Sequence, residues 1–163
     1  MKNYILTKET AENKLRRIAY EVMENNFDEP HIILAGIRES GSVIARNIQH
    51  LLMEIGNLST QLLTVSLDKK TPRAVEVSEK IDFNNKVIIL IDDVSNSGRT
   101  LTYALKPFLE FQPKKIQTLV LVERSHKAFP VQPDYVGLSV ATTLQEHIYV
   151  EVEGEKVIGA YLQ

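Results

Sequence analysis

The sequence contains no cysteine and carries little net charge, and each absence excludes a class of function. Without cysteine there can be no disulfide, no thiolate catalysis and no cysteine-ligated zinc site. A formal charge of −2 at pH 7 gives no overall attraction to nucleic acid, so such binding would need a local basic face. No apolar run is long enough to span a bilayer, and the N-terminal stretch lacks the apolar core of a signal peptide. These features predict a cytoplasmic protein.

What is present suits one folded domain. The chain has 163 residues, enough to bury a sizeable core, with 44% hydrophobic and 25% charged residues. We find no internal repeat, no low-complexity tract and no long linker. The sequence therefore predicts a single domain over residues 1–163.

Apolar periodicity predicts helices that alternate with strands. The expected helices are 7–26 with Thr7 as N-cap, 41–56, and about 99–111, which Pro107 kinks or ends early. The expected strands are 31–36, 60–67, 86–91 and 117–123, followed by strand-like pieces at 135–140, 147–152 and 157–162. Strands rich in Val, Ile and Leu that alternate with helices indicate an α/β fold with a parallel sheet covered on both faces.

Ligands bind such sheets beyond the carboxyl ends of the strands, which draws attention to residues 87–100, VIILIDDVSNSGRT. Here an apolar strand ends at Asp92 and Asp93, and Ser-Asn-Ser-Gly-Arg-Thr leads into the next expected helix. Amides at a helix N-terminus, small hydroxyls and a glycine suit a phosphate. Carboxylates would repel a phosphate but would bind sugar hydroxyls, so together they suggest a ribose 5-phosphate. The alternative is that the acids merely end a strand and Ser97-Gly98 forms a turn.

The same stretch resembles the phosphoribosyl pyrophosphate (PRPP) signature of type I phosphoribosyltransferases, with Ser97 where the family usually has threonine. Four further segments resemble, in the same order, the PyrR branch of that family: KLRRIAYEVMENN, ILAGIRESG, LVERSHKAFPVQPDYVG and VATTLQEHIYVEV. PyrR proteins regulate the pyrimidine operon and act as uracil phosphoribosyltransferases. The resemblance implies the type I phosphoribosyltransferase fold, a mostly parallel central sheet flanked by helices with a small hood.

The resemblance also implies residue roles around the signature. Asp92 and Asp93 correspond to the catalytic acidic pair that contacts the ribose hydroxyls, and fixed negative charge there stabilises an oxocarbenium-like transition state. The 5-phosphate would be held by Ser95, Asn96, Ser97, Gly98, Arg99 and Thr100, although the Arg99 side chain could instead point to solvent. Mg²⁺ would arrive with the pyrophosphate and take few, if any, direct protein ligands.

Residues 36–41, GIRESG, match the pyrophosphate loop of the family, which gives Arg38, Glu39, Ser40 and Gly41 as binding residues. PyrR proteins usually carry Thr-Arg-Gly where this chain has Glu-Ser-Gly. The missing cation should weaken pyrophosphate binding unless Arg38 substitutes for it. Arg38 could also be an ordinary surface arginine.

The base would be recognised by Glu123, Arg124, Tyr135 and Val136, with the tyrosine ring stacked on the base and the valine backbone reading its edge. Lysine stands at the position of Glu123 in the hypoxanthine-guanine branch, where it suits a purine carbonyl. An acid at this position therefore favours a pyrimidine.

Two segments depart from the PyrR pattern. The loop at 67–85 is shorter than the mobile PyrR loop, and its Lys69 and Lys70 could reach the pyrophosphate or form a solvated charge cluster. The first helix keeps Lys14, Arg16 and Arg17 but not the other basic residues of the RNA-binding face of PyrR.

The sequence thus predicts an enzyme that transfers phosphoribosyl from PRPP to a nucleobase, with uracil favoured. The first alternative is a regulator that senses PRPP or nucleotide and binds RNA with little turnover, and the second is a purine phosphoribosyltransferase. The expected partners are PRPP and a nucleobase, with RNA under the regulator alternative. The family resemblance further implies homodimers or tetramers.

Overall fold

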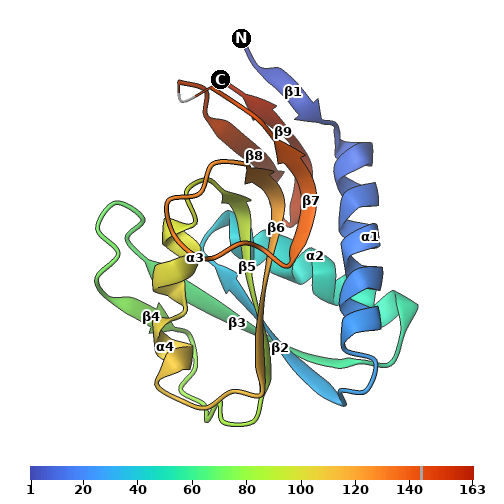
Figure 1. Cartoon of the computed structure of the whole chain (residues 1–163). Helices are drawn as coiled ribbons and strands as arrows, with labels where there is room; N and C mark the ends of the chain where they lie inside the picture. The colour runs from blue at the N-terminus through green and yellow to red at the C-terminus, as the bar shows by residue number, and fades with distance from the viewer. Residues whose placement is uncertain (144) are drawn as a thin grey trace.

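The computed structural model describes residues 1–143 and 145–163 (Figure 1). Its helices are α1 (Lys8–Asn25), α2 (Ser40–Ile55), α3 (Arg99–Ala104) and α4 (Lys106–Leu109). Its strands are β1 (Asn3–Leu6), β2 (His31–Ile37), β3 (Ser59–Leu67), β4 (Val75–Val77), β5 (Val87–Ser95), β6 (Lys115–Arg124), β7 (Tyr135–Val140), β8 (Ile148–Glu153) and β9 (Lys156–Leu162). Among these described residues, no helix combines the length and the apolar character that crossing a membrane requires.

Six of the described strands form one sheet in the order β4-β3-β2-β5-β6-β7. All neighbouring pairs are parallel except β3 and β4, which run antiparallel at one edge. The strand order reverses between β2 and β5, so the carboxyl ends of these two strands open a crevice where ligands bind in open α/β sheets. The α/β class and the mostly parallel sheet predicted from the sequence are confirmed.

Helices cover both faces of this sheet, which explains why β2 and β5 are almost entirely apolar. On one face, the buried sides of α1 and α2 pack against Leu34, Ile89 and Ile91. On the other face, Leu101 and Phe108 of α3 and α4 pack with a second apolar cluster. The two layers hold the strands rigidly, and this rigidity fixes the residues at the strand ends.

The hood is a separate three-stranded antiparallel sheet in the order β1-β9-β8. It joins the two ends of the chain, since Tyr4 of β1 pairs with Tyr161 of β9 (Figure 1). Sequence periodicity did not predict β1 because a four-residue strand is too short to display alternation. The hood lies above the carboxyl ends of the main strands and so borders the expected ligand site (Figure 1).

Thr7 and Pro107 act on their helices as the sequence predicts. Thr7 caps α1 as expected, through a reciprocal capping box with Thr10. The helix expected over 99–111 is divided into α3 and α4 at Leu105, just before Pro107. Proline lacks the amide hydrogen that would continue the helical hydrogen bonds, so the division follows from the sequence.

Candidate functional site

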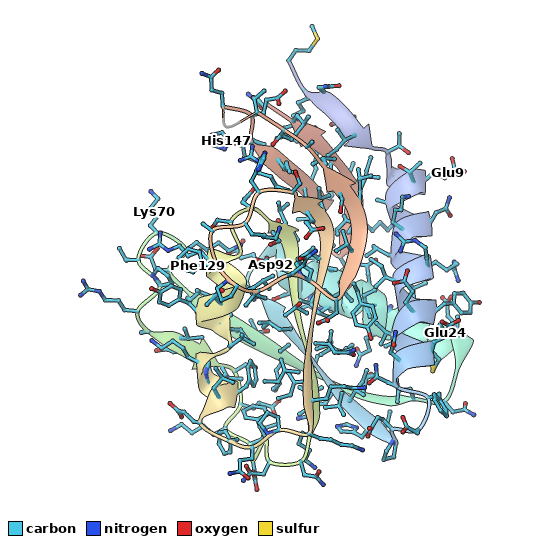
Figure 2. All side chains as sticks on the ribbon, in the orientation of Figure 1. Glu9, Glu24, Lys70, Asp92, Phe129 and His147 are labelled. Atoms are coloured by element: carbon cyan, nitrogen blue, oxygen red, sulfur yellow. The ribbon has the colours of Figure 1, made fainter. Side chains whose placement is uncertain are left out.

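The acidic pair lies toward the carboxyl end of β5, and Figure 2 shows Asp92 near the centre of the molecule. The Asp92 side chain is only 1% exposed and that of Asp93 18% exposed. Each carboxylate is oriented by the backbone, since Asp93 N donates to Asp92 Oδ1 at 2.9 Å and Val94 N donates to Asp93 Oδ1 at 2.8 Å. Burial, and secondarily the neighbouring Asp93 carboxylate, raise the pKa of Asp92 well above its ordinary value.

A lysine that the sequence left ambiguous lies directly on this pair. Lys69 Nζ is 3.4 Å from both carboxylate oxygens of Asp92 and 4.0 Å from Asp93 Oδ1. The ammonium opposes the rise in the pKa of Asp92 by favouring its ionised form. Lys69 therefore belongs to the site in this structure, rather than to a solvated charge cluster.

The expected pyrophosphate loop lies against the acidic pair. A side chain at Gly41 would place its Cβ 2.7 Å from the Ile91 carbonyl oxygen and 3.0 Å from Asp92 Cα, so only glycine permits this approach. Ser40 is the first residue of α2, and the peptide bond between Arg38 and Glu39 is cis. The structure thus brings the N-terminus of α2, with its unpaired amides, beside the two carboxylates.

The Arg38 side chain lies at the surface of the protein rather than inside the site. Its side chain is 65% exposed and lies 3.9 Å from Glu39, a surface ion pair, while its backbone amide donates to Val65 O at 2.9 Å. Together with Arg73, Arg38 lines a cavity of about 570 Å³ beside the strand ends of β3. Breaking the surface ion pair with Glu39 costs little free energy, so the guanidinium is available to a ligand.

The expected phosphate loop connects β5 to α3, and the segment around Ala128 and Phe129 packs against it. Ser97 O accepts two backbone hydrogen bonds, from the amides of Ala128 and Phe129, each at 3.0 Å. Gly98 has φ 85°, a left-handed conformation that suits glycine, and it lies against the carbonyl oxygens of this same supporting segment. The chain turns here so that the amides of 98–100 start α3.

The residues of 95–100 differ in exposure. Asn96 and Arg99 are exposed, and Ser97 and Thr100 are partly exposed, so these four can meet a phosphate. Ser95 is 3% exposed, and its hydroxyl has no hydrogen-bond partner among the described residues. Its side chain is enclosed by the protein at the end of β5, so a direct contact between Ser95 Oγ and a phosphate at the surface is not supported.

Glu123 and Arg124 end β6, three to four residues beyond the level of Asp92 on the neighbouring strand. Glu123 pairs in register with Ser95 on one side and Ser139 on the other, and Ser139 Oγ donates to Glu123 Oε2 at 2.8 Å. Lys127 Nζ lies 3.3 Å from Glu123 Oε1. A row of three polar side chains, those of Ser95, Glu123 and Ser139, therefore crosses the carboxyl ends of three parallel strands.

Arg124 holds the segment that follows β7. Its guanidinium donates to Thr142 Oγ1, to Thr143 O at 2.9 Å, and to Glu146 O. Because these contacts use most of its donors, Arg124 positions the wall of the site more than it reads a ligand directly.

The structure corrects the prediction for Tyr135. Tyr135 is 2% exposed, its ring lies in the core beside α1, and its hydroxyl donates to Gln117 Oε1 at 2.7 Å. Burial raises its pKa to about 12. It pairs with Leu119, four positions before Glu123 and so roughly 13 Å down the strand. An enclosed ring cannot stack on a base.

Val136 pairs with Val120, which is the partner of Asp92 on β5, so Val136 stands level with the acidic pair and its contact with a base stays a prediction. Its carbonyl oxygen accepts from the Arg17 guanidinium at 3.1 Å. The residues that stand level with Glu123 and Arg124 are Ser139 and Val140. The sequence analysis did not single out these two residues, although the strand at 135–140 was expected and ligands bind beyond the carboxyl ends of such strands.

The side chains present fit a Mg²⁺ ion that arrives with a diphosphate. Within residues 1–143 and 145–163, no group of three or more carboxylate or imidazole side chains could enclose a metal by itself. Two carboxylates at one rim can bind a hydrated Mg²⁺ whose other ligands are water and phosphate oxygens, which is the usual arrangement for this ion. Asp92 and Asp93 are the residues that would contact it.

The fold and this arrangement are typical of a transferase that acts on a sugar phosphate. An acidic pair, the expected phosphate loop and a loop whose Gly41 packs closely on β5 lie around the carboxyl ends of a parallel sheet. Comparison with known families agrees, since residues 3–153 match the phosphoribosyl transferase domain model. The chain belongs to the type I phosphoribosyltransferase family, and its sequence is PyrR-like, which confirms the resemblance.

Relatives named "Bifunctional protein PyrR" cover most of the chain. The protein of Haemophilus ducreyi is 32% identical over 163 residues, spanning 94% of this chain and 91% of its own. That of Streptococcus pneumoniae is 37% identical over 150 residues, spanning 88% and 86%. The hypoxanthine phosphoribosyltransferase of Trypanosoma cruzi superposes with a TM-score of 0.76 at 12% identity, covering 85% of this chain and 82% of that one. This last likeness concerns the fold alone.

Proposed function

We propose that the protein transfers the phosphoribosyl group of PRPP to uracil, giving the nucleotide and pyrophosphate. The observation that carries the proposal is the contact between Gly41 and the acidic pair, which joins a diphosphate-binding loop to a sugar-binding one. In the reaction, the bond between the anomeric carbon and the diphosphate oxygen breaks, and its electron pair leaves with the diphosphate. The base nitrogen forms the new bond to that carbon and loses its proton.

The residues of the chain would each act on one part of PRPP. Asp92 and Asp93 accept hydrogen bonds from the ribose hydroxyls, and their negative charge favours the cationic ribosyl transition state over the ground state. The amides at the start of α2 bind the leaving diphosphate, and residues 96–100 bind the 5-phosphate. Mg²⁺, when bound, neutralises the diphosphate.

The preference for a pyrimidine rests on Glu123. Its carboxylate can only accept hydrogen bonds, and it lies near the end of β6, level with Ser95 and three residues beyond the level of Asp92. Uracil offers its N3–H as a donor to such an acceptor. The carboxylate already accepts from Ser139, which fixes its orientation.

The proposal is tested by incubating the protein with Mg²⁺ and PRPP and a panel of uracil, cytosine, hypoxanthine, guanine and adenine, followed by separation of the nucleotides. UMP as the main product is expected. Asp93→Asn should weaken PRPP binding at least about tenfold, because a charge-assisted hydrogen bond is lost. If no base in the panel yields a nucleotide, the enzymatic proposal is wrong.

A regulatory function in RNA binding is a second candidate, favoured by the relatives named "Bifunctional protein PyrR". The basic residues of α1 are partly engaged within the protein. Arg16 lies 3.4 Å from Glu54, and Arg17 contacts Glu21 and donates to Gly137 O at 2.8 Å. RNA affinity should fall steeply with salt if phosphate contacts carry it. Binding no tighter than that of an unrelated acidic protein would exclude this function.

A further inference from the structure

The loop between β6 and β7 packs on one side of the expected phosphate loop. We call residues 125–134 the β6–β7 loop, and in Figure 1 it leaves the top of β6, passes over α3 and returns to β7. Figure 2 shows Phe129 of this loop on the α3 side of Asp92. The loop is therefore placed to influence the start of α3 without being part of the expected phosphate loop itself.

Both ends of the β6–β7 loop are fixed on the main sheet. At its start, Ser125 N donates to Val140 O at 3.2 Å. At its end, Asp134 N donates to Thr118 O at 2.9 Å, and Asp134 Oδ2 accepts from Thr118 N at 2.8 Å. The support that the loop gives to its neighbours therefore comes from the sheet.

The centre of the β6–β7 loop orients one peptide group of the phosphate loop. Ser97 O accepts from the amides of Ala128 and Phe129, each at 3.0 Å. The peptide bond between Ser97 and Gly98 is trans, so its C=O and N–H point in opposite directions. The Gly98 N–H therefore points away from the β6–β7 loop. A phosphate on this turn can only lie on that side, because the β6–β7 loop occupies the other.

Gly98 is itself held closely by the β6–β7 loop. A Cβ at Gly98 would lie 3.0 Å from Val131 O and 3.3 Å from Phe129 O, which leaves room for glycine alone in its left-handed conformation. The helix that follows, α3, has only six residues. So short a helix depends on packing for its stability, and the β6–β7 loop supplies part of that packing.

The Phe129 side chain fastens the centre of the β6–β7 loop to α3. Its ring meets that of Tyr103 edge to face, with the centroids 6.3 Å apart and the ring planes at 62°. Such a pair is favourable beyond the area that it buries. Nearby, Val131 packs with the apolar cluster that contains Leu101. The ring of Phe129 therefore holds in place the residue whose own amide orients Ser97 O.

We infer that Phe129 is a positioning residue for the 5-phosphate. Its packing on Tyr103 holds two amides on Ser97 O, and this directs the Gly98 N–H toward the phosphate. Phe129 acts through the peptide group between Ser97 and Gly98 rather than through its own contact with the ligand. The inference rests on the proposed function for the choice of ligand, a ribose 5-phosphate group.

Four variants separate positioning from stability. Phe129→Ala removes the ring, and Tyr103→Ala removes the other side of the same contact. Phe129→Leu keeps an apolar side chain against Tyr103 and should restore binding. The matched control is Phe111→Ala, since Phe111 is also partly exposed and meets the ring of Phe83 edge to face at 5.3 Å, beyond the end of α4.

Binding of ribose 5-phosphate and of Mg²⁺-pyrophosphate is measured by calorimetry on each protein. Phe129→Ala and Tyr103→Ala should bind ribose 5-phosphate about tenfold more weakly, the effect of losing one hydrogen bond to a charged group. Their affinity for pyrophosphate should not change, because the expected pyrophosphate loop follows β2, across β5 from β6. Phe129→Leu and Phe111→Ala should bind both ligands like the wild type.

The inference is overturned if Phe129→Ala binds ribose 5-phosphate as tightly as the wild type does. It is also overturned if pyrophosphate binding falls equally, or if Phe111→Ala shows the same loss, since either result indicates a general loss of stability. If Phe129→Ala does not fold, Tyr103→Ala decides by the same criteria.

Failure of the proposed function gives a different result. If the wild type does not bind ribose 5-phosphate, the proposed function is wrong, and the role of Phe129 is then decided without ligand. The chain has seven glycines, so selective ¹⁵N-glycine labelling gives a simple NMR spectrum. The order parameter of the Gly98 N–H should fall in Phe129→Ala and stay unchanged in Phe111→Ala. Equal values in wild type and Phe129→Ala contradict the positioning role.

Discussion

Replacing Asp92 by asparagine should stabilise the protein while removing its ability to bind PRPP. Asp92 is 1% exposed, and burial and the adjacent carboxylate raise its pKa well above the ordinary value. For a group whose folded-state pKa is raised, the stability it contributes is fully present below its unfolded pKa, near 3.8, and is lost as the pH rises through the folded pKa. At pH 7 the carboxylate is therefore a destabilising group that the site retains for its function.

The size of the effect follows from what asparagine keeps and what it loses. The side-chain oxygen of asparagine can still accept the hydrogen bond that Asp93 N donates to Asp92 Oδ1 at 2.9 Å in the native protein, so the local backbone is preserved. The contact with the half-exposed Lys69 is lost, at a cost of about 0–1 kcal/mol. Removing a buried, poorly compensated charge should exceed this cost and leave a net gain of about 1–2 kcal/mol. For a chain of this size, the melting temperature should rise by about 2–8 °C.

Thermal melts of Asp92→Asn and wild type at several pH values test this reasoning. The advantage of the variant should be largest near pH 7 and should shrink as the pH falls toward about 4, because the wild-type carboxyl then becomes neutral as well. Asp93→Asn is the matched control: its side chain is 18% exposed, so its stability gain should be smaller, while it also loses PRPP binding. A variant less stable than wild type at pH 7 would refute the argument.

Three further substitutions probe the rest of the site. Gly41→Ala should destabilise the protein by about 1–3 kcal/mol in denaturant unfolding and weaken PRPP binding in calorimetry, because the new methyl meets backbone atoms of β5. Ser95→Ala should change the free energy of unfolding by less than about 1 kcal/mol, since its buried hydroxyl has no partner to lose; a larger loss would reveal one. Arg124→Lys cannot reproduce the contacts with Thr142 and its neighbours, so limited proteolysis after β7 should accelerate.

The central sheet and the acidic pair were predictable because their signals are local. An unbroken apolar run that ends in two acids and a glycine-containing turn specifies a buried strand and the start of a helix without reference to the rest of the chain. The glycine at 41 was expected in the pyrophosphate loop, but its contact with Asp92 depends on the parallel pairing of β2 with β5, which no local pattern encodes.

The prediction for Tyr135 was wrong because its side chain faces the core. A strand pattern over 135–140 is the same whichever neighbour it pairs with, so the level of Tyr135 relative to Glu123 could not be derived from it. The pairing of Leu119 with Tyr135 puts the tyrosine in the core and Ser139 at the rim. Similarly, β4 has only three residues, and it forms because β3 offers an edge to pair with.

The positive charge missing at Ser40 is supplied elsewhere in this site. Arg38 and Arg73 line one cavity beside the loop, and Lys69 lies on the acidic pair. Under the proposed function, a Mg²⁺-bound diphosphate would meet these side chains once the ribose hydroxyls take the carboxylates. Each of these cations is at least partly exposed and weakly engaged, so moving it costs little compared with a charge-assisted contact to phosphate. Under the proposed function, these three cations would together take the place of the arginine that PyrR proteins carry in the pyrophosphate loop.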